Sequence, residues 1–326
     1  MSSHPLERIC IVGAGAIGCT LAARLGAGGR AVSMLARGET LQRIRQHGVE
    51  LNDRDGQHRV AVRVESDCQA LGEQDLIFVC TKAPALAQLL PTLAPLLGAS
   101  TIVVPVVNGV PWWYFHGEPG RFSGQRVEAV DPGGALSDAL ALEHVLGCVV
   151  FITAEVEQPA VVRCANPHLM ILGEPDNRLS PRLEQVRALI ESAGIEARAT
   201  DRIRDSLWTK IIANLTSNPL SVVTGATLEE LYGQPPLQRV VSKMLNEALL
   251  TAAAYGARVS IDPQTFMRLG ADMGPVRTSM LQDFDHGRPL ELQAIGDAVI
   301  ELAGLQGLNM PVTQDILTLA RFRAQH

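Results

Sequence analysis

Short apolar runs and stretches of helical periodicity alternate through the first part of the chain. Residues 8–18, "RICIVGAGAIG", combine an apolar strand, a glycine turn and the start of a helix. Further apolar runs follow at 31–37, 75–82 and 101–109. Continuous runs of this kind are typical of parallel strands that are buried on both faces. Because such strands alternate with helices, the pattern predicts a doubly wound α/β sheet.

Between residues 147 and 200 the pattern predicts shorter strands and one well-marked helix. Strand-like runs occupy 148–156, 160–164, 169–173 and 195–200. "SPRLEQVRALIESAG" is a helix that has Ser180 as N-cap, Pro181 in its first turn and Gly194 at its C-terminus. The sequence pattern of residues 49–64 predicts a hairpin around Asp55-Gly56. The segment 111–145 is not assigned, apart from an aromatic loop, "PWWYFHGEPG".

After Asp201 the periodicity becomes almost entirely helical. Helices are expected at 202–224, 227–232, 236–256, shortly after Asp262, at 290–305 and beyond Pro311. We therefore expect an N-terminal Rossmann-type α/β domain over residues 1–200 and an all-α domain over 201–326.

Composition narrows the classes of function. The 326 residues are 47% hydrophobic and carry a net charge of −6, which favours a folded chain and disfavours a nucleic-acid surface. Prolines interrupt the apolar stretch 89–113, so it is a poor membrane span. The six cysteines form no C-x-x-C pair, which favours buried thiols in a reducing cytoplasm over disulfides or a metal site. A signal peptide at the N-terminus is the less favoured alternative to the glycine loop.

The glycine turn fits a dinucleotide phosphate loop. Its residues are Gly13, Ala14, Gly15, Ala16, Ile17 and Gly18. This G-x-G-x-x-G follows a strand and opens a helix, which is the context that gives the motif its meaning. The first glycine permits the tight turn, the second lets the backbone approach a pyrophosphate, and the third allows close helix–strand packing. The alternative is a glycine turn that binds nothing.

The residue after the second strand bears on the choice of cofactor. NAD enzymes usually carry an acidic residue there for the ribose 2′-hydroxyl, whereas this chain has Arg37. A guanidinium suits a 2′-phosphate, so NADP(H) is favoured. The nearby acidic residue Glu39 leaves NAD as an alternative cofactor. Lys82 and Asn108 each end a predicted strand, at the edge of the sheet where ligands bind, and are further site candidates.

One predicted helix carries polar side chains near its apolar stripe. Ile203, Leu207, Ile211 and Leu215 recur at helical spacing, and Lys210, Asn214 and Asn218 fall on nearly the same stripe. Buried polar groups destabilise a fold unless they find partners. We therefore expect this face to line a cleft that holds substrate and cofactor. The alternative is a lysine at the edge of the stripe that extends to water.

These motifs together resemble the ketopantoate reductases, the 2-dehydropantoate 2-reductases. The similarity covers nearly the whole chain and rests on "VGAGAIG" (12–18), Arg37, "CTKA" (80–83), "VVNGV" (106–110), "LWTKIIANLTSNPL" (207–220) and "SMLQDFDHGRPLE" (279–291). The resemblance implies NADPH-dependent reduction of 2-dehydropantoate to (R)-pantoate, a step toward pantothenate and coenzyme A.

The resemblance also implies roles for single residues. Lys210 matches the proton donor, and Glu291 an acidic residue near the cofactor and the substrate hydroxyl. The implied substrate-binding residues are Asn108, Asn214, Asn218 and Thr278, with Ser279 beside it. The implied cofactor contacts are the loop 13–18, Arg37, Lys82 and Asn108.

The chain departs from the family pattern in places. Leu228 stands at or near the position where some members carry another substrate-binding asparagine, and "ELQAIGD" follows Glu291 without the usual acidic residue and Asn-Gly. The alternatives are therefore a related NAD(P)-dependent dehydrogenase of another 2-oxo or hydroxy acid, or a catalytically silent NADP-binding sensor. The helical domain has apolar faces compatible with a homodimer as well as with a monomer.

Overall fold

The chain forms two compact units. The computed structural model describes residues 5–326. The first unit comprises the described residues up to Val107, together with Phe115–Gln125 and Ala135–Ile203. The second comprises Asn108–Tyr114, Arg126–Gly134 and Arg204–His326. Two short segments that precede residue 200 therefore pack with the helices that follow it.

A parallel five-stranded sheet forms the centre of the first unit. Its order is β5-β2-β1-β6-β7, with β1 at Ile9–Val12, β2 at Val32–Leu35, β5 at Arg63–Glu65, β6 at Gln74–Val79 and β7 at Leu97–Pro105. All four residues of β1 are buried, as the apolar run predicts. The predicted Rossmann-type parallel sheet is confirmed.

Two smaller sheets complete this unit. One has the order β4-β3-β10-β9 and the other β12-β11-β8. Their strands are β3 (Val49–Asp53), β4 (Gly56–Val60), β8 (Gly147–Phe151), β9 (Ala154–Gln158), β10 (Val161–Cys164), β11 (Leu169–Gly173) and β12 (Glu196–Ala199). The prediction of one strand over 148–156 is wrong, because the chain leaves the sheet after Phe151 and enters a different one at Ala154.

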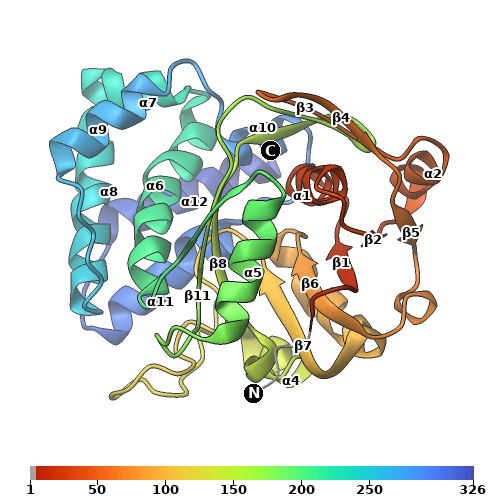
Figure 1. Ribbon diagram of the computed structural model, residues 1–326. Helices are drawn as coiled ribbons and strands as arrows, with labels where there is room; N and C mark the ends of the chain where they lie inside the picture. Colours follow the sequence, from red (N-terminus) through yellow and green to blue (C-terminus); the bar gives the residue numbers. More distant parts are fainter. Residues whose placement is uncertain (1–4) are drawn as a thin grey trace. The chain divides into compact units, whose positions relative to one another are not determined.

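Helices cover these sheets. Helix α1 (Ala16–Ala27) contacts β1 and β2 as well as β3, β4 and β10, so it lies between the parallel sheet and the four-stranded sheet (Figure 1). Helix α5 (Pro181–Ser192) packs on β11 and β12 and has the predicted Ser180 N-cap. The remaining elements are α2 (Gly38–His47), α3 (Leu86–Leu89), α4 (Ala135–Ala139) and the 3₁₀ turns η1 (Cys68–Ala70), η2 (Ala83–Ala85), η3 (Leu90–Leu96), η4 (Pro132–Gly134, in the second unit) and η5 (Leu142–His144).

The second unit is helical, as predicted. Its helices are α6 (Ile203–Thr224), α7 (Leu228–Gly233), α8 (Pro235–Ala254), α9 (Pro263–Asp272), α10 (Ser279–Asp285), α11 (Ala298–Leu305) and α12 (Pro311–Gln325). Sequence periodicity did not reveal α10, which has only seven residues. The helix predicted at 290–305 begins with a π-helical turn, η6 (Gln293–Asp297), before α11. Leu220 of α6 packs with Tyr232, Met244 and Ile316 in one apolar core of this unit.

The aromatic residues of segment 111–114 are buried in the core of the second unit. Trp112, Trp113 and Tyr114 are at most 3% exposed. Arg204 donates two hydrogen bonds to the Tyr114 carbonyl, and Trp208 Nε1 donates to the Tyr114 hydroxyl at 2.8 Å. These bonds tie the segment to the first turns of α6.

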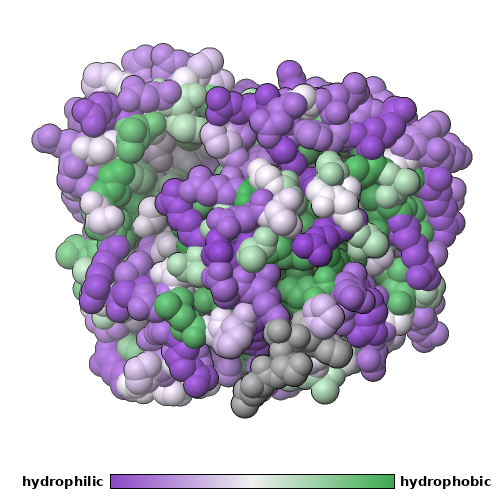
Figure 2. All heavy atoms as spheres, in the orientation of Figure 1, coloured by the Kyte–Doolittle hydropathy of each residue, from purple (hydrophilic) through white to green (hydrophobic). Residues whose placement is uncertain are grey.

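Hydrophilic side chains cover much of the face seen in Figure 2, and apolar ones show in several places, among them the region of α8 and α9. Leu250 of α8, Leu269 of α9 and Met273, which follows α9, are at least half exposed. A homodimer through such a face stays a prediction. In the part of the chain that the structure describes, no helix combines the length and apolar character needed to span a membrane.

Candidate active site

In the glycine loop of the first unit, neighbouring protein atoms require glycine at two positions but not at the third. At Gly13 φ is +105°, and a Cβ there would lie 2.9 Å from Thr81 Cγ2. A Cβ at Gly18 would lie 1.9 Å from the Gly13 carbonyl oxygen, so close packing requires this glycine. Gly15 differs, because its φ is −84° and a Cβ would meet nothing within 4 Å. A glycine at this position therefore leaves space in which a ligand can approach the backbone.

The start of α1 completes a cradle for an anion. Gly15 is the N-cap, no side chain caps this end, and the first turn holds no acidic residue. Uncapped N–H groups and the positive end of the helix dipole favour a phosphate. The loop residues, including Ala14, Ala16 and Ile17, thus fit a dinucleotide pyrophosphate.

Two cationic candidates lie at the ends of strands in the same unit. Arg37 follows β2 as the N-cap of α2, and Lys82 follows β6 as the N-cap of η2. Both side chains are exposed, and so is Glu39. Arg37 is therefore accessible to a ligand phosphate at the strand end where the sequence predicts it.

Helix α6 presents the predicted polar row in the second unit. The four apolar residues of the stripe, Ile203, Leu207, Ile211 and Leu215, are at most 5% exposed. Lys210 and Asn214 are half-buried, and Asn218 is 3% exposed. The row thus runs from partly accessible to buried along the helix.

The amide of Asn218 is the most unusual group in this row. Its Nδ2 is buried and has no hydrogen-bond partner. Its Oδ1 accepts a long hydrogen bond, 3.4 Å, from Ser217 Oγ. A buried donor without an acceptor destabilises the free protein by about 1–3 kcal/mol, so this amide is suited to an acceptor that the chain does not supply.

Thr278 lies close to α6. Its hydroxyl caps α10 by accepting from the Leu281 N–H, and it is 2.6 Å from Ser221 Oγ. Thr278 is 5% exposed, whereas the neighbouring Ser279 is exposed. Sequence reasoning missed Ser221. The Thr278 N-cap before an apolar run was the available signal for α10.

Asn108 and Glu291 meet within the second unit. Asn108 Nδ2 donates to Glu291 Oε2 at 3.3 Å. The adjacent Gly109 has φ +85°, and a Cβ there would lie 2.3 Å from the Ala294 carbonyl oxygen. The Val110 N–H donates to that same oxygen at 2.8 Å. Gly109 therefore allows the close approach that brings Asn108 beside Glu291, which is 7% exposed.

The cysteines lie mostly in buried environments, which disfavour the thiolate. Five of the six are buried, and Cys80 is partly buried. Burial raises the pKa of the Cys10 and Cys19 thiols to about 12. No cluster of three or more His, Cys, Asp or Glu side chains suited to a metal ion is found over residues 5–326.

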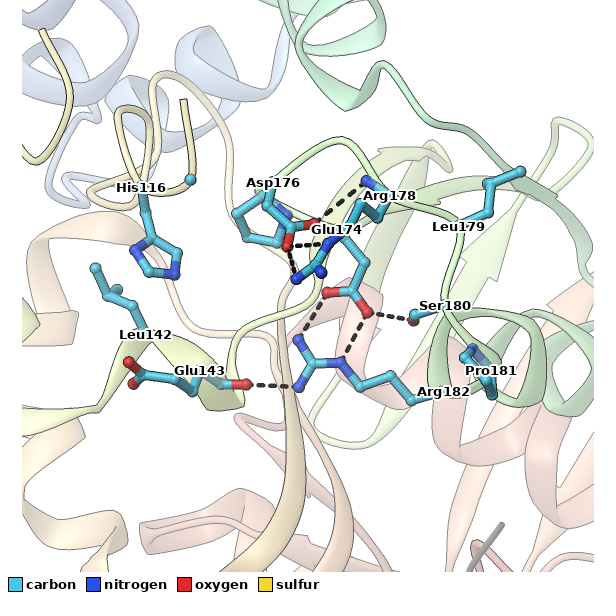
Figure 3. Close-up of a pocket in the computed structure, with 12 residues that line it drawn as sticks. His116, Leu142, Glu143, Glu174, Asp176, Arg178, Leu179, Ser180, Pro181 and Arg182 are labelled. Atoms are coloured by element: carbon cyan, nitrogen blue, oxygen red, sulfur yellow. Dashed lines mark hydrogen bonds and ion pairs between the residues drawn. The ribbon is translucent and has the colours of Figure 1, made fainter. Parts of the chain in front are cut away.

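A pocket of about 620 Å³ in the first unit contains none of the predicted site residues (Figure 3). Its wall includes Glu174, which is 5% exposed. Arg182 binds both carboxylate oxygens of Glu174, at 2.8 and 2.7 Å, and Ser180 donates to it as well. The charge of Glu174 is therefore already neutralised within the protein.

Comparisons with known proteins agree on one family. The sequence profile "Ketopantoate reductase PanE/ApbA" matches residues 9–112, and "Ketopantoate reductase PanE/ApbA C terminal" matches residues 202–324. A 2-dehydropantoate 2-reductase from Mesorhizobium japonicum is 39% identical over 316 residues, which cover 96% of this chain and 97% of the relative.

Solved structures give the same result. A crystal structure from Ralstonia solanacearum MolK2, provisionally described as a ketopantoate reductase, has a TM-score of 0.93 at 40% identity and covers 98% of both chains. The 2-dehydropantoate 2-reductase of Geobacter metallireducens GS-15 has a TM-score of 0.85 at 25% identity, covering 97% of this chain and 99% of that one.

Proposed function

We propose, from the premise that this chain belongs to the ketopantoate reductase family of oxidoreductases, that it reduces 2-dehydropantoate to (R)-pantoate with NADPH. The reaction would serve the route to pantothenate and coenzyme A. The residues of each unit support one part of this proposal.

The first unit supplies the groups for a nicotinamide dinucleotide. When bound, the reduced cofactor supplies the hydride. The loop 13–18 holds the pyrophosphate, because Gly15 leaves open space and α1 begins there without a side-chain cap. Exposed Arg37 pairs with the 2′-phosphate, which favours NADP(H) over NAD. Lys82 is a further cationic contact at a strand end.

The second unit supplies the groups for the 2-oxo acid. Lys210 would donate a proton to the carbonyl oxygen of the bound acid, and its charge would stabilise negative charge that develops on that oxygen. Asn214 and Asn218 donate to substrate oxygens, and Thr278, with Ser279 beside it, holds the carboxylate. Glu291 accepts the substrate hydroxyl and is oriented by Asn108, which donates to it.

The observation that carries this assignment is the unpartnered amide of Asn218. It is buried at 3% exposure on the helix face that also bears Lys210 and Asn214, and its Nδ2 has no acceptor in the protein. An oxygen of a bound substrate would satisfy it.

Rapid-mixing measurements of NADPH oxidation test the proposal. We expect 2-dehydropantoate to be reduced with a higher kcat/KM than other branched 2-oxo acids, and NADPH to be preferred over NADH. Preference for another 2-oxo acid would instead indicate a related dehydrogenase. Tight NADPH binding without oxidation by any of these acids would indicate a sensor.

A further inference from the structure

Ser221 joins two parts of the proposed substrate site through one hydroxyl. Its side chain lies on α6 and is fully buried. Ser221 Oγ is 2.6 Å from Thr278 Oγ1, a residue 57 positions away, and 2.7 Å from the Asn218 carbonyl oxygen. Thr278 Oγ1 also accepts the Leu281 N–H at 3.1 Å.

The hydroxyl protons of Ser221 and Thr278 allow two arrangements of these hydrogen bonds. Each hydroxyl has one proton to donate. If Ser221 donates to the Asn218 carbonyl, then the short contact requires Thr278 to donate to Ser221. If Ser221 donates to Thr278, then the Thr278 hydroxyl accepts two hydrogen bonds and its own proton is available for a third group. The two arrangements differ only in hydroxyl rotation.

A carboxylate would select the second arrangement. It accepts hydrogen bonds and donates none, so it favours a Thr278 proton that points toward it. The Asn218 carbonyl lies inside α6 and retains its place in the helical hydrogen-bond pattern when Ser221 turns away. A hydroxyl that accepts from two donors is also a stronger donor itself, because hydrogen-bond chains are cooperative.

We propose that Ser221 is a positioning residue for substrate selection, which directs the Thr278 proton toward the carboxylate of the 2-oxo acid. The inference rests on the proposed function. A second observation comes from the side-chain amide of Asn218, the residue whose backbone carbonyl Ser221 contacts: its buried Nδ2 has no acceptor within the protein.

Steady-state kinetics of Ser221→Ala with 2-dehydropantoate and with its uncharged carboxamide test the inference. We expect the KM for the acid to rise roughly three- to tenfold, with kcat changed by less than about twofold, since one hydrogen bond to a charged group is weakened. The preference for acid over carboxamide should fall by the same factor, whereas a merely structural role would affect both substrates equally.

Two variants act as controls. Thr216→Val removes a second buried hydroxyl pair on α6, the 3.0 Å contact of Thr216 with Tyr232, and should leave the preference unchanged. Ser221→Thr keeps the hydroxyl and should restore the preference. If Ser221→Thr does not fold, the comparison of Ser221→Ala with Thr216→Val still shows whether the acid-to-carboxamide preference depends on the Ser221 hydroxyl.

The outcomes separate the two proposals. A wild-type protein that reduces the acid, with an unchanged acid-to-carboxamide preference in Ser221→Ala, would overturn this inference alone. A wild-type protein that reduces no 2-oxo acid would overturn the proposed function, and the inference with it.

Discussion

Asn108 Nδ2 and Glu291 Oε2 lie 3.3 Å apart, although 183 positions separate the two residues in the chain. The contact depends on Gly109, which lets the backbone pass close to Ala294. The amide thereby fixes one oxygen of a carboxylate that is 7% exposed. A carboxylate held in this way can accept a substrate hydroxyl with little reorganisation.

Replacing this carboxylate tests its role. Glu291→Gln removes the charge and keeps the size, so we expect kcat/KM for the 2-oxo acid to fall roughly ten- to a hundredfold, the range for one hydrogen bond to a charged group. Glu301→Gln is the matched control, because Glu301 accepts the Glu128 and Ala129 N–H groups, both at 2.8 Å. The control should lower the melting temperature and leave kinetics unchanged; equal kinetic losses would contradict the role.

Lys210→Ala should lower kcat by roughly 10²–10⁴ while NADPH binding persists, since a positioned acid contributes about this factor. Lys210→Arg retains a cation but holds its proton too firmly to donate it, so kcat should stay low with KM nearly unchanged. Lys243→Ala removes an exposed lysine of α8 and serves as control. A Lys210→Ala variant that keeps most of its turnover would rule out proton donation.

Local sequence patterns were sufficient to predict most of the helices and the parallel sheet. Helix α6 was expected at 202–224 and spans Ile203–Thr224, and its apolar stripe from Ile203 to Leu215 keeps a helical period over roughly three turns. The parallel sheet followed from apolar runs around the glycine loop. The division between β8 and β9 could not be predicted, since apolar residues run across it without a turn signal.

Long-range contacts explain what the sequence left open in the site. The Asn108–Glu291 and Ser221–Thr278 contacts join residues 183 and 57 positions apart, and no local pattern encodes such pairs. Burial of Trp112 in the second unit is equally a result of tertiary packing. The sequence could indicate which residue types to expect in the candidate site, but not their partners across the fold.

The glycine loop offers a test that separates ligand binding from packing. Gly18→Ala should destabilise the fold by at least about 2 kcal/mol, because its Cβ would overlap the Gly13 carbonyl oxygen. Gly15→Ala meets open space and should change stability by no more than about 1 kcal/mol. We nevertheless expect Gly15→Ala to weaken NADPH binding at least about tenfold in fluorescence titrations. Unchanged affinity would mean that the pyrophosphate binds elsewhere.

Arg37 should decide between the two cofactors. Arg37→Ala removes the guanidinium proposed to pair with the 2′-phosphate, so the KM for NADPH should rise roughly ten- to a hundredfold while that for NADH changes little. Arg45→Ala removes an exposed arginine of α2 that pairs with Glu65 and should affect neither KM. A parallel loss with both cofactors would place Arg37 away from the 2′-phosphate.

A charge cluster around the buried side chains of Arg24, Asp53 and His168 links α1 to the hairpin β3–β4. Arg24 Nη2 lies 2.7 Å from Asp53 Oδ2 and 2.6 Å from Asp55 Oδ2. His168 Nε2 is buried 4.0 Å from Asp53 Oδ2, and His58 Nε2 is 3.2 Å from Asp53 Oδ1. Burial first, and then the Arg24 charge, lower the pKa of His168 against the attraction of the two aspartates.

This shift predicts loss of stability in mild acid. The pKa of His168 is lower in the folded than in the unfolded chain, so the unfolded chain binds more protons below about pH 6.5. The free energy of unfolding should therefore fall as the pH drops below that value, by at most about 1.4 kcal/mol per pH unit from this group. Urea unfolding at pH 5 to 7 measures the slope, which His168→Asn should flatten. His47→Asn, at an exposed position of α2, should keep the wild-type slope, and an equal effect of both substitutions would exclude His168 as the source.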